Sequence, residues 1–249
     1  MRHVVWFSCG AASAVAARLC MDAHPDTTTV VYCDTSASEH RDNMRFFADV
    51  ERWVGAPIVK LRSEKYRDVD DVFEQTRYMA GLAGARCTVE MKKVPRFKFQ
   101  KADDIHVFGM TADEVPRIER LENNNPELSL LWILRDMGIT KRMCYDVLSK
   151  ARIAIPLMYR FGYKHNNCIG CVKATSPKYW SAIKRDFPDV FERRVKQSRD
   201  IGCRLVRVDG QRVFLDEMPV GDYDLFDDEQ LTCGPECAEG GWSWQVIAQ

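Results

Sequence analysis

The chain alternates short apolar runs with amphipathic segments. Segment 39–54 places Met44, Phe47, Val50 and Val54 on one helical face, whereas runs rich in β-branched and aromatic residues predict strands. We expect strands at 4–7, 27–33, 57–61 and 104–109, and helices at 13–23 and 39–54. Because strands and helices alternate, the pattern predicts an α/β fold with a Rossmann-like, doubly wound and mostly parallel sheet.

The pattern is less regular in the second half of the chain. We expect a helix at 66–82, a helical excursion from the sheet that contains a helix at 140–151, a charged helix at 178–203, and a hairpin of 205–208 with 213–215. Asp209-Gly210 is typical of the hairpin turn, and the acidic stretch 222–229 is predicted to be a mobile linker. The chain is therefore divided into an α/β domain, 1–162, and a smaller helical, cysteine-containing region, 163–249.

Composition narrows the class of protein. With 249 residues and 46% hydrophobic content, the chain can bury one substantial core. Its formal net charge is zero, so attraction to nucleic acid or a membrane would need a local patch. No apolar run has the length of a membrane span and no signal pattern opens the sequence, so we expect a cytoplasmic protein without membrane contact. Ten cysteines in a reducing compartment indicate thiol, metal or redox chemistry.

A turn of small residues joins the first predicted strand to the first helix. It is formed by Ser8, Cys9, Gly10, Ala11, Ala12 and Ser13. Small residues let backbone N–H groups approach a phosphate at the positive end of a helix, and the two serines add hydroxyl donors. The turn is therefore a candidate anion site, although any α/β protein has tight turns of this kind. Asp34, after the second predicted strand, could bind a ribose hydroxyl or simply cap a helix.

Two further segments carry charge that suits an anion. Lysines and arginines, Lys92 and Lys93 among them, surround Cys87, where they would stabilise a thiolate and attract an anion; a solvated basic helix face is the alternative. Gly109 follows the strand at 104–109, and Arg117 follows an acidic pair. Arg117 could lie beside a bound phosphate or form an ordinary surface ion pair.

Cys168 and Cys171 form a Cys-x-x-Cys pair, which usually binds zinc or an iron–sulfur cluster and is sometimes a redox pair. Two ligands need partners, and Cys87, Cys233 and Cys237 are available. We expect the other cysteines to be packing residues: Cys9, Cys20, Cys33, Cys144 and Cys203. His165 is predicted to be a loop histidine rather than a ligand.

In their order along the chain, these segments resemble the phosphoadenosine phosphosulfate (PAPS) reductase family of the PP-loop superfamily, especially its divergent phage members and its relatives in DNA sulfur modification. The turn 8–13 is similar to the PP-loop, Asp34-Thr35 to the family's Asp-Thr-Gly, and 87–95 to its Cys-Cys-x-x-Arg-Lys-x-x-Pro element. Gly109 to Arg117 resembles the substrate-side segment, and Cys233-Gly234 the tail that carries the reductase nucleophile. The resemblance implies an adenine nucleotide alpha-hydrolase-like fold.

The sequence departs from the family at four places. Ala12 replaces the acid that assists magnesium binding and pyrophosphate release in the adenylating branch. The cysteine tandem is reduced to Cys87, followed by Thr88, and Thr232 stands where the reductase tail has glutamate. The tail also has a second cysteine, Cys237.

The resemblance implies a reductase that binds PAPS, its unphosphorylated analogue APS, or ATP as adenine nucleotide. Cys233 would attack sulfur, Lys93 and Arg117 would hold the anionic groups, and a thioredoxin-like donor would complete the reaction. A 4Fe–4S cluster would be bound by Cys87, Cys168, Cys171 and Cys237, with zinc as the alternative. Two other hypotheses remain: an ATP-dependent sulfur transferase acting on nucleic acid, and a non-catalytic nucleotide-binding module with structural zinc.

Overall fold

The fold was analysed in a computed structural model that describes residues 1–81 and 83–219. Its centre is a five-stranded, all-parallel sheet with the strand order β3-β2-β1-β6-β7. The strands are β1 (His3–Phe7), β2 (Thr28–Cys33), β3 (Val59–Leu61), β6 (Ile105–Phe108) and β7 (Ser129–Leu131). The predicted α/β fold with a parallel sheet is therefore confirmed.

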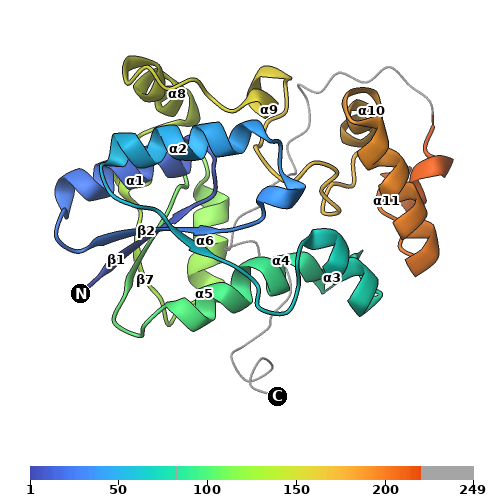
Figure 1. The fold of residues 1–249 in the computed structure, drawn as a ribbon, viewed down its shortest axis with the longest axis horizontal. Coiled ribbons are helices and arrows are strands. Elements are labelled where there is room, and N and C mark those ends of the chain that lie inside the picture. The colour runs from blue at the N-terminus through green and yellow to red at the C-terminus, as the bar shows by residue number, and fades with distance from the viewer. Residues whose placement is uncertain (82, 220–249) are drawn as a thin grey trace.

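Helices cover both faces of the sheet, as Figure 1 shows. Side chains alternate along β1: Val5 and Phe7 join one core cluster, whereas Val4 and Trp6 join another. The first face carries α1 (Ala11–Ala23), α2 (Asp42–Val54), α7 (Ile133–Asp136) and α8 (Lys141–Lys150), and the second carries α5 (Val94–Phe99) and α6 (Val115–Asn124). Burial on both faces explains why β1 is a continuous apolar run.

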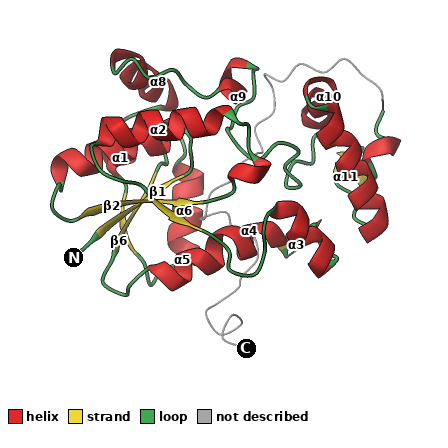
Figure 2. Cartoon of the chain, viewed as in Figure 1, coloured by secondary structure: helices red, strands yellow, loops and turns green. Residues whose placement is uncertain are grey.

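A second core packs the C-terminal helices against an earlier part of the chain. Figure 2 shows α10 (Pro177–Asp186) and α11 (Pro188–Ile201) on the side of the molecule opposite the N-terminus. Their core includes Trp180 and Phe191, and it also takes in Val72 and Phe73 of α3 (Val69–Thr76). This core therefore extends across residue 162, where the sequence suggested a domain boundary.

The remaining elements are short. They are the pair β4 (Ala80–Gly81) and β5 (Gly84–Ala85), α4 (Arg86–Thr88), a π-helical turn (Val89–Lys93), α9 (Leu157–Arg160), and the hairpin of β8 (Val206–Val208) with β9 (Gln211–Val213). Asp209 and Gly210 both have positive φ, 48° and 81°, which the two-residue turn of a hairpin requires. The hairpin and its turn are thus present as predicted, but the second strand is 211–213 instead of 213–215.

Three local predictions were wrong, and one alternative interpretation is excluded. The helix expected at 66–82 is limited to α3, and Pro188 divides the helix expected at 178–203 into α10 and α11. The excursion after residue 123 contains β7, which joins the sheet beside β6. The basic segment is not a solvated helix face, because Lys92, Lys93 and Arg96 are only 9%, 7% and 2% exposed. The predicted linker 222–229 lies outside the described residues.

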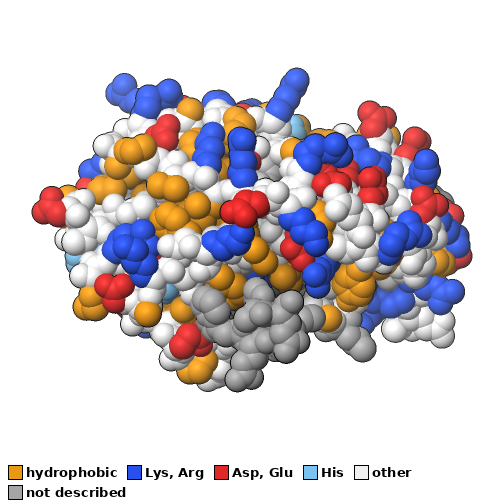
Figure 3. Space-filling model, turned by 60° about the horizontal axis from the view of Figure 1, so that its bottom comes forward, with side chains coloured by type: hydrophobic (Ala, Val, Ile, Leu, Met, Phe, Trp, Pro, Cys, Tyr) orange, Lys and Arg blue, Asp and Glu red, His pale blue; other side chains and the backbone are white. Residues whose placement is uncertain are grey.

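Charges of both signs are interspersed on the face shown in Figure 3, around groups of apolar side chains. Among the described residues visible in this view, positive and negative side chains therefore alternate over the surface. Within 1–81 and 83–219, no helix has both the length and the apolar character needed to span a membrane.

Candidate functional site

The turn between β1 and α1 lies where the strand order of the sheet reverses. From β1, the chain adds β2 and β3 on one side, and it later adds β6 and β7 on the other. In open parallel sheets, ligands bind at the carboxyl ends of the strands beside this switch point. Gly109, directly after β6, packs on the first residues of α1: a Cβ at position 109 would be 2.5 Å from the backbone N of Ser13. The two predicted segments therefore meet at this position.

Hydrogen bonds within the turn fix its shape. The Ser13 hydroxyl accepts from the backbone N–H of Ser8 at 3.1 Å and donates to the carbonyl oxygen of Gly10 at 3.0 Å. Cys9 has a left-handed backbone with φ 54°, which is uncommon for a residue other than glycine. Gly10 caps α1 and has no side chain to accept from the first helical N–H groups. The capping residue itself therefore places no side chain over the positive end of α1.

A cleft of about 890 Å³ lies over this end of the sheet. The turn contributes Ser8, Gly10, Ala12 and Ser13 to its lining. Four cationic and two acidic side chains line the cleft as well. The complete set of other lining residues is Trp6, Phe108, Gly109, Thr111, Asp113, Glu114, Pro116, Arg117, Arg120, Lys141, Tyr145, Tyr159, Lys164, His165, Asn166 and Asn167.

Burial and charge set the protonation of the groups in the cleft. Burial, followed by the charges of Lys141 and Arg117, lowers the pKa of His165 to about 3, so its imidazole is neutral at pH 7. Burial also lowers the pKa of Lys141. For Glu114, burial would raise the pKa, but Arg117 and hydrogen bonds from Thr111 outweigh it and the pKa is lowered. The cleft therefore combines a neutral imidazole with charged side chains of both signs.

Arg117 also contacts Glu114, with 2.6 Å between its Nη1 and Oε1 of the carboxylate. Glu114 directly precedes α6 and Arg117 lies in the first turn of this helix, so the ion pair is local in sequence. The ion pair that the sequence left as one alternative is therefore present, and both of its residues line the cleft.

Several predicted nucleotide-binding residues lie outside the lining of the cleft. Cys9 and Ala11 are fully buried in the core beneath α1. Asp34 accepts hydrogen bonds from Ser36 and from Arg62, which is 2.9 Å away. Burial would raise the pKa of Asp34, but these contacts lower it. Thr35 is buried and donates to Glu39.

Three of the predicted metal ligands meet in a second, smaller cavity. Cys87, Cys168 and Cys171 line it together, although Cys87 lies far from the other two in sequence. Lys92, Lys173 and Arg194 line the same cavity, and their positive charge would favour thiolates. Lys93 lies on the neighbouring π-helical turn, buried, and lines neither cavity. Cys233 and Cys237 lie outside the described residues.

We call this second cavity, lined by Cys87, Cys168 and Cys171, the thiol cavity. Its side chains are of a type that binds metals. Three thiols are three of the four ligands of a tetrahedral zinc or of an iron–sulfur cluster. The cavity volume is about 20 Å³, which holds roughly one water molecule and suits a single ion better than a cluster. Within the described parts of the chain, no group of three or more His, Cys, Asp or Glu side chains could hold a metal ion by itself. A bound metal would therefore require a ligand from the tail or a shift of these thiols.

Sequence reasoning missed several residues that line the cleft, namely Arg120, Lys141, Tyr145, Tyr159, Lys164 and Asn166. Arg120 could have been found, because it lies one helical turn after Arg117. The others come from α8, α9 and the segment at 164–167, which approach the turn only in the folded chain. No local pattern distinguishes them from ordinary surface residues.

The comparisons with known proteins add no family assignment. No model of a known protein family matches the chain, and no curated protein matches it either.

Proposed function

We propose that this protein is an adenine-nucleotide-binding enzyme of sulfur metabolism that reduces a sulfonucleotide, with an adenine nucleotide alpha-hydrolase-like fold. The observation that carries the proposal is the cleft at the switch point of the sheet, where the turn 8–13 and four cationic side chains line one space. Such a site suits a ligand with several anionic groups next to an apolar base. Trp6, Phe108 and Tyr145 supply the apolar lining.

Different residues of the cleft would bind different groups of the ligand. The N-terminal end of α1 would bind one anionic group through backbone N–H groups and the serine hydroxyls. Arg117 and its cationic neighbours in the cleft would hold a second anionic group and stabilise the charge on the leaving phosphate. The Ala12 side chain adds no carboxylate, which suits a reaction in which no pyrophosphate is released.

The chemical step would use Cys233 as nucleophile. Its thiolate would attack the sulfur of the sulfonucleotide, forming an S–S bond as the S–O bond to phosphate breaks and the nucleotide leaves with the electron pair. A dithiol donor of the thioredoxin type would then attack Cys233 Sγ and release sulfite. Its second thiol would resolve the mixed disulfide, so the two electrons come from the donor.

The thiol cavity would hold a metal centre through Cys87, Cys168 and Cys171, with Cys237 as the proposed fourth ligand. An iron–sulfur cluster or a zinc ion bound there would tie the cysteine-bearing tail to the body of the protein. If Cys237 is the ligand, Cys233 remains available for the chemical step.

The proposal is tested by incubating the protein with PAPS and reduced thioredoxin and measuring sulfite. Wild-type protein should release sulfite, Cys233→Ser should not, and Cys20→Ser should behave as wild type, because Cys20 is a buried residue of α1 that contacts Thr28. Equal sulfite release by wild type and Cys233→Ser would overturn the mechanism. Release of pyrophosphate from ATP without sulfite formation would favour the ATP-dependent sulfur transferase instead.

A further inference from the structure

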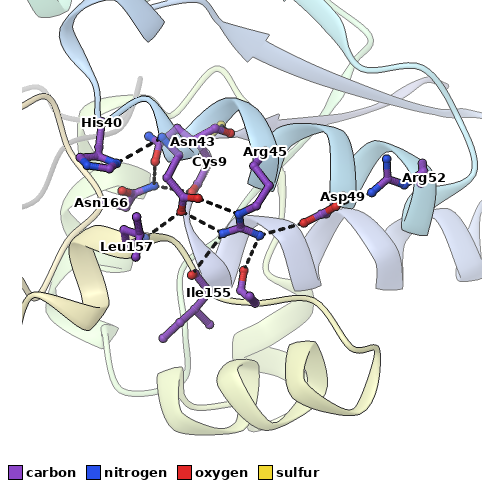
Figure 4. A network of polar contacts seen from close by, with 11 residues as sticks. Cys9, His40, Asn43, Arg45, Asp49, Arg52, Ile155, Leu157 and Asn166 are labelled. Atoms are coloured by element: carbon purple, nitrogen blue, oxygen red, sulfur yellow. Dashed lines mark hydrogen bonds and ion pairs between the residues drawn. The ribbon is translucent and has the colours of Figure 1, made fainter.

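A chain of side-chain amides links the turn 8–13 to helix α2 and to the segment that carries the Cys-x-x-Cys pair (Figure 4). The Asn166 Nδ2 group donates to the carbonyl oxygen of Cys9 at 2.7 Å and to Oδ1 of Asn43 at 2.9 Å. The Asn43 Nδ2 group donates in turn to Oε2 of Glu39 at 2.7 Å. Asn43 is fully buried and Asn166 is only 6% exposed.

The direction of every hydrogen bond in this chain is determined by its two ends. The Cys9 carbonyl can only accept, so Asn166 must present its amide nitrogen to it. The Glu39 carboxylate also accepts from Thr35 and Tyr32, so Asn43 must present its nitrogen to Glu39 and its oxygen to Asn166. Neither amide can be flipped without placing two acceptors against each other.

A second contact joins the same two segments. The backbone N–H groups of Ala11 and Asn166 both act on the Tyr159 hydroxyl to lower its pKa, which burial raises. A Cβ at Gly10 would lie 3.2 Å from that hydroxyl, so the turn and Tyr159 are in close contact. Asn166 therefore contacts the turn directly through its side chain and indirectly through its backbone.

The Asn166 amide also carries an energetic cost. Its Oδ1 is buried and has no hydrogen-bond partner within the described residues, although Asn166 lines the cleft. A buried acceptor without a partner destabilises the folded state. The amide orientation that leaves Oδ1 without a partner is the one that presents the amide nitrogen to the carbonyl of Cys9. Cys9 is the residue with the left-handed backbone.

We propose that Asn166, oriented by Asn43 and Glu39, is a positioning residue that holds the turn 8–13 in its ligand-binding conformation. This inference rests on the proposed function of the cleft. Asn166 acts through the backbone carbonyl of Cys9, the residue directly before Gly10, which caps α1. Cys168 follows Asn166 by two positions, so the segment that bears the thiols also sets the shape of the anion-binding turn.

The test combines hydrogen–deuterium exchange of peptides covering residues 8–13 with the affinity for adenosine 3′,5′-bisphosphate, measured by calorimetry. Asn166→Ala should speed exchange in these peptides and weaken binding about tenfold or more. Asn43→Ala, which leaves Asn166 in place without its orienting acceptor, should act in the same direction and more weakly. Asn125→Ala is the matched control, because its amide also donates to a backbone carbonyl, that of Leu121, at the end of α6.

The outcomes separate this inference from the proposed function. If wild-type protein does not bind the bisphosphate but exchange at 8–13 rises in Asn166→Ala, the positioning role stands and the nucleotide function fails. Unchanged exchange at 8–13 in both Asn166→Ala and Asn43→Ala overturns the positioning role, whatever the affinity. An equal loss of affinity in Asn125→Ala also overturns it, because the effect would then be a general loss of stability.

Discussion

Gly109 lies directly against the backbone of Ser13, and a Cβ at position 109 would be 2.5 Å from both Cα and N of Ser13. The carboxyl end of β6 and the beginning of α1 can approach this closely only because residue 109 has no side chain. The contact brings the turn 8–13 to the mouth of the cleft. It thereby connects a local sequence feature, a glycine after a strand, with the geometry of the proposed binding site.

Gly109→Ala is therefore expected to displace the first turn of α1. A methyl group at 2.5 Å from backbone atoms forces the helix or β6 to move, which costs about 1–3 kcal/mol of unfolding free energy. Nucleotide affinity should fall as well, and both can be measured by urea unfolding and calorimetry. Gly202→Ala is the control: its φ of 77° costs stability, but a Cβ there meets no atom within 4 Å, so affinity should be kept.

Arg117→Ala should weaken nucleotide binding by about tenfold to a hundredfold. A charge-assisted hydrogen bond to phosphate is worth about 1.5–3 kcal/mol, and Arg117 lines the cleft next to the positive end of α1. The salt dependence of the affinity should decrease in the variant, because one cation fewer faces the ligand. Arg135→Ala, which removes a surface ion pair with Asp136, should bind as wild type. Equal losses in the two variants would contradict an anion site at Arg117.

The stability of the protein should decrease as the pH falls from about 6.5 to about 4. Burial, followed by the charge of Arg96, lowers the pKa of His106 to about 4, and Trp6 Nε1 donates to its Nδ1 at 3.0 Å. In this pH range the unfolded chain binds a proton that the native state excludes, so the unfolding free energy falls with pH, by up to about 3 kcal/mol.

The His106→Gln variant keeps an acceptor for Trp6 and removes the titration, so its unfolding free energy should depend less on pH. Urea unfolding of both proteins between pH 4 and 7 measures the two slopes. A variant slope as steep as that of wild type would show that His106 does not carry this dependence. His165, whose pKa is also lowered, would then be the next histidine to replace.

Cys171→Ser should reduce the metal content of anaerobically purified protein and lower its melting temperature. The side chain lines the thiol cavity with Cys87 and Cys168, and removing one thiolate ligand weakens a tetrahedral site strongly. Elemental analysis measures the metal, and visible absorption distinguishes an iron–sulfur cluster from colourless zinc. Cys20→Ser, far from the cavity lining, should keep its metal. Metal-free wild-type protein would refute a metal centre at these thiols.

The sequence by itself determined the elements whose signal is local. The continuous apolar run of β1, the apolar stripe of α2 and the Asp209-Gly210 turn each follow from the conformational preferences of a few adjacent residues. The order of strands and helices then predicted a parallel sheet, and with it the position of the turn 8–13 at the carboxyl end of β1. The small residues of that turn also marked the anion site.

Only the tertiary structure decided which side chains share a cavity. Lys141, Tyr159 and Asn166 reach the turn because α8, α9 and the following segment pack beside α1, a contact between residues far apart in the chain. Asp34 follows its strand as predicted, yet its carboxylate is engaged by Arg62 and Ser36 outside the cleft. Hydrophobic periodicity specifies which face of an element is buried, but convergence of polar side chains depends on how distant elements pack, which no local pattern encodes.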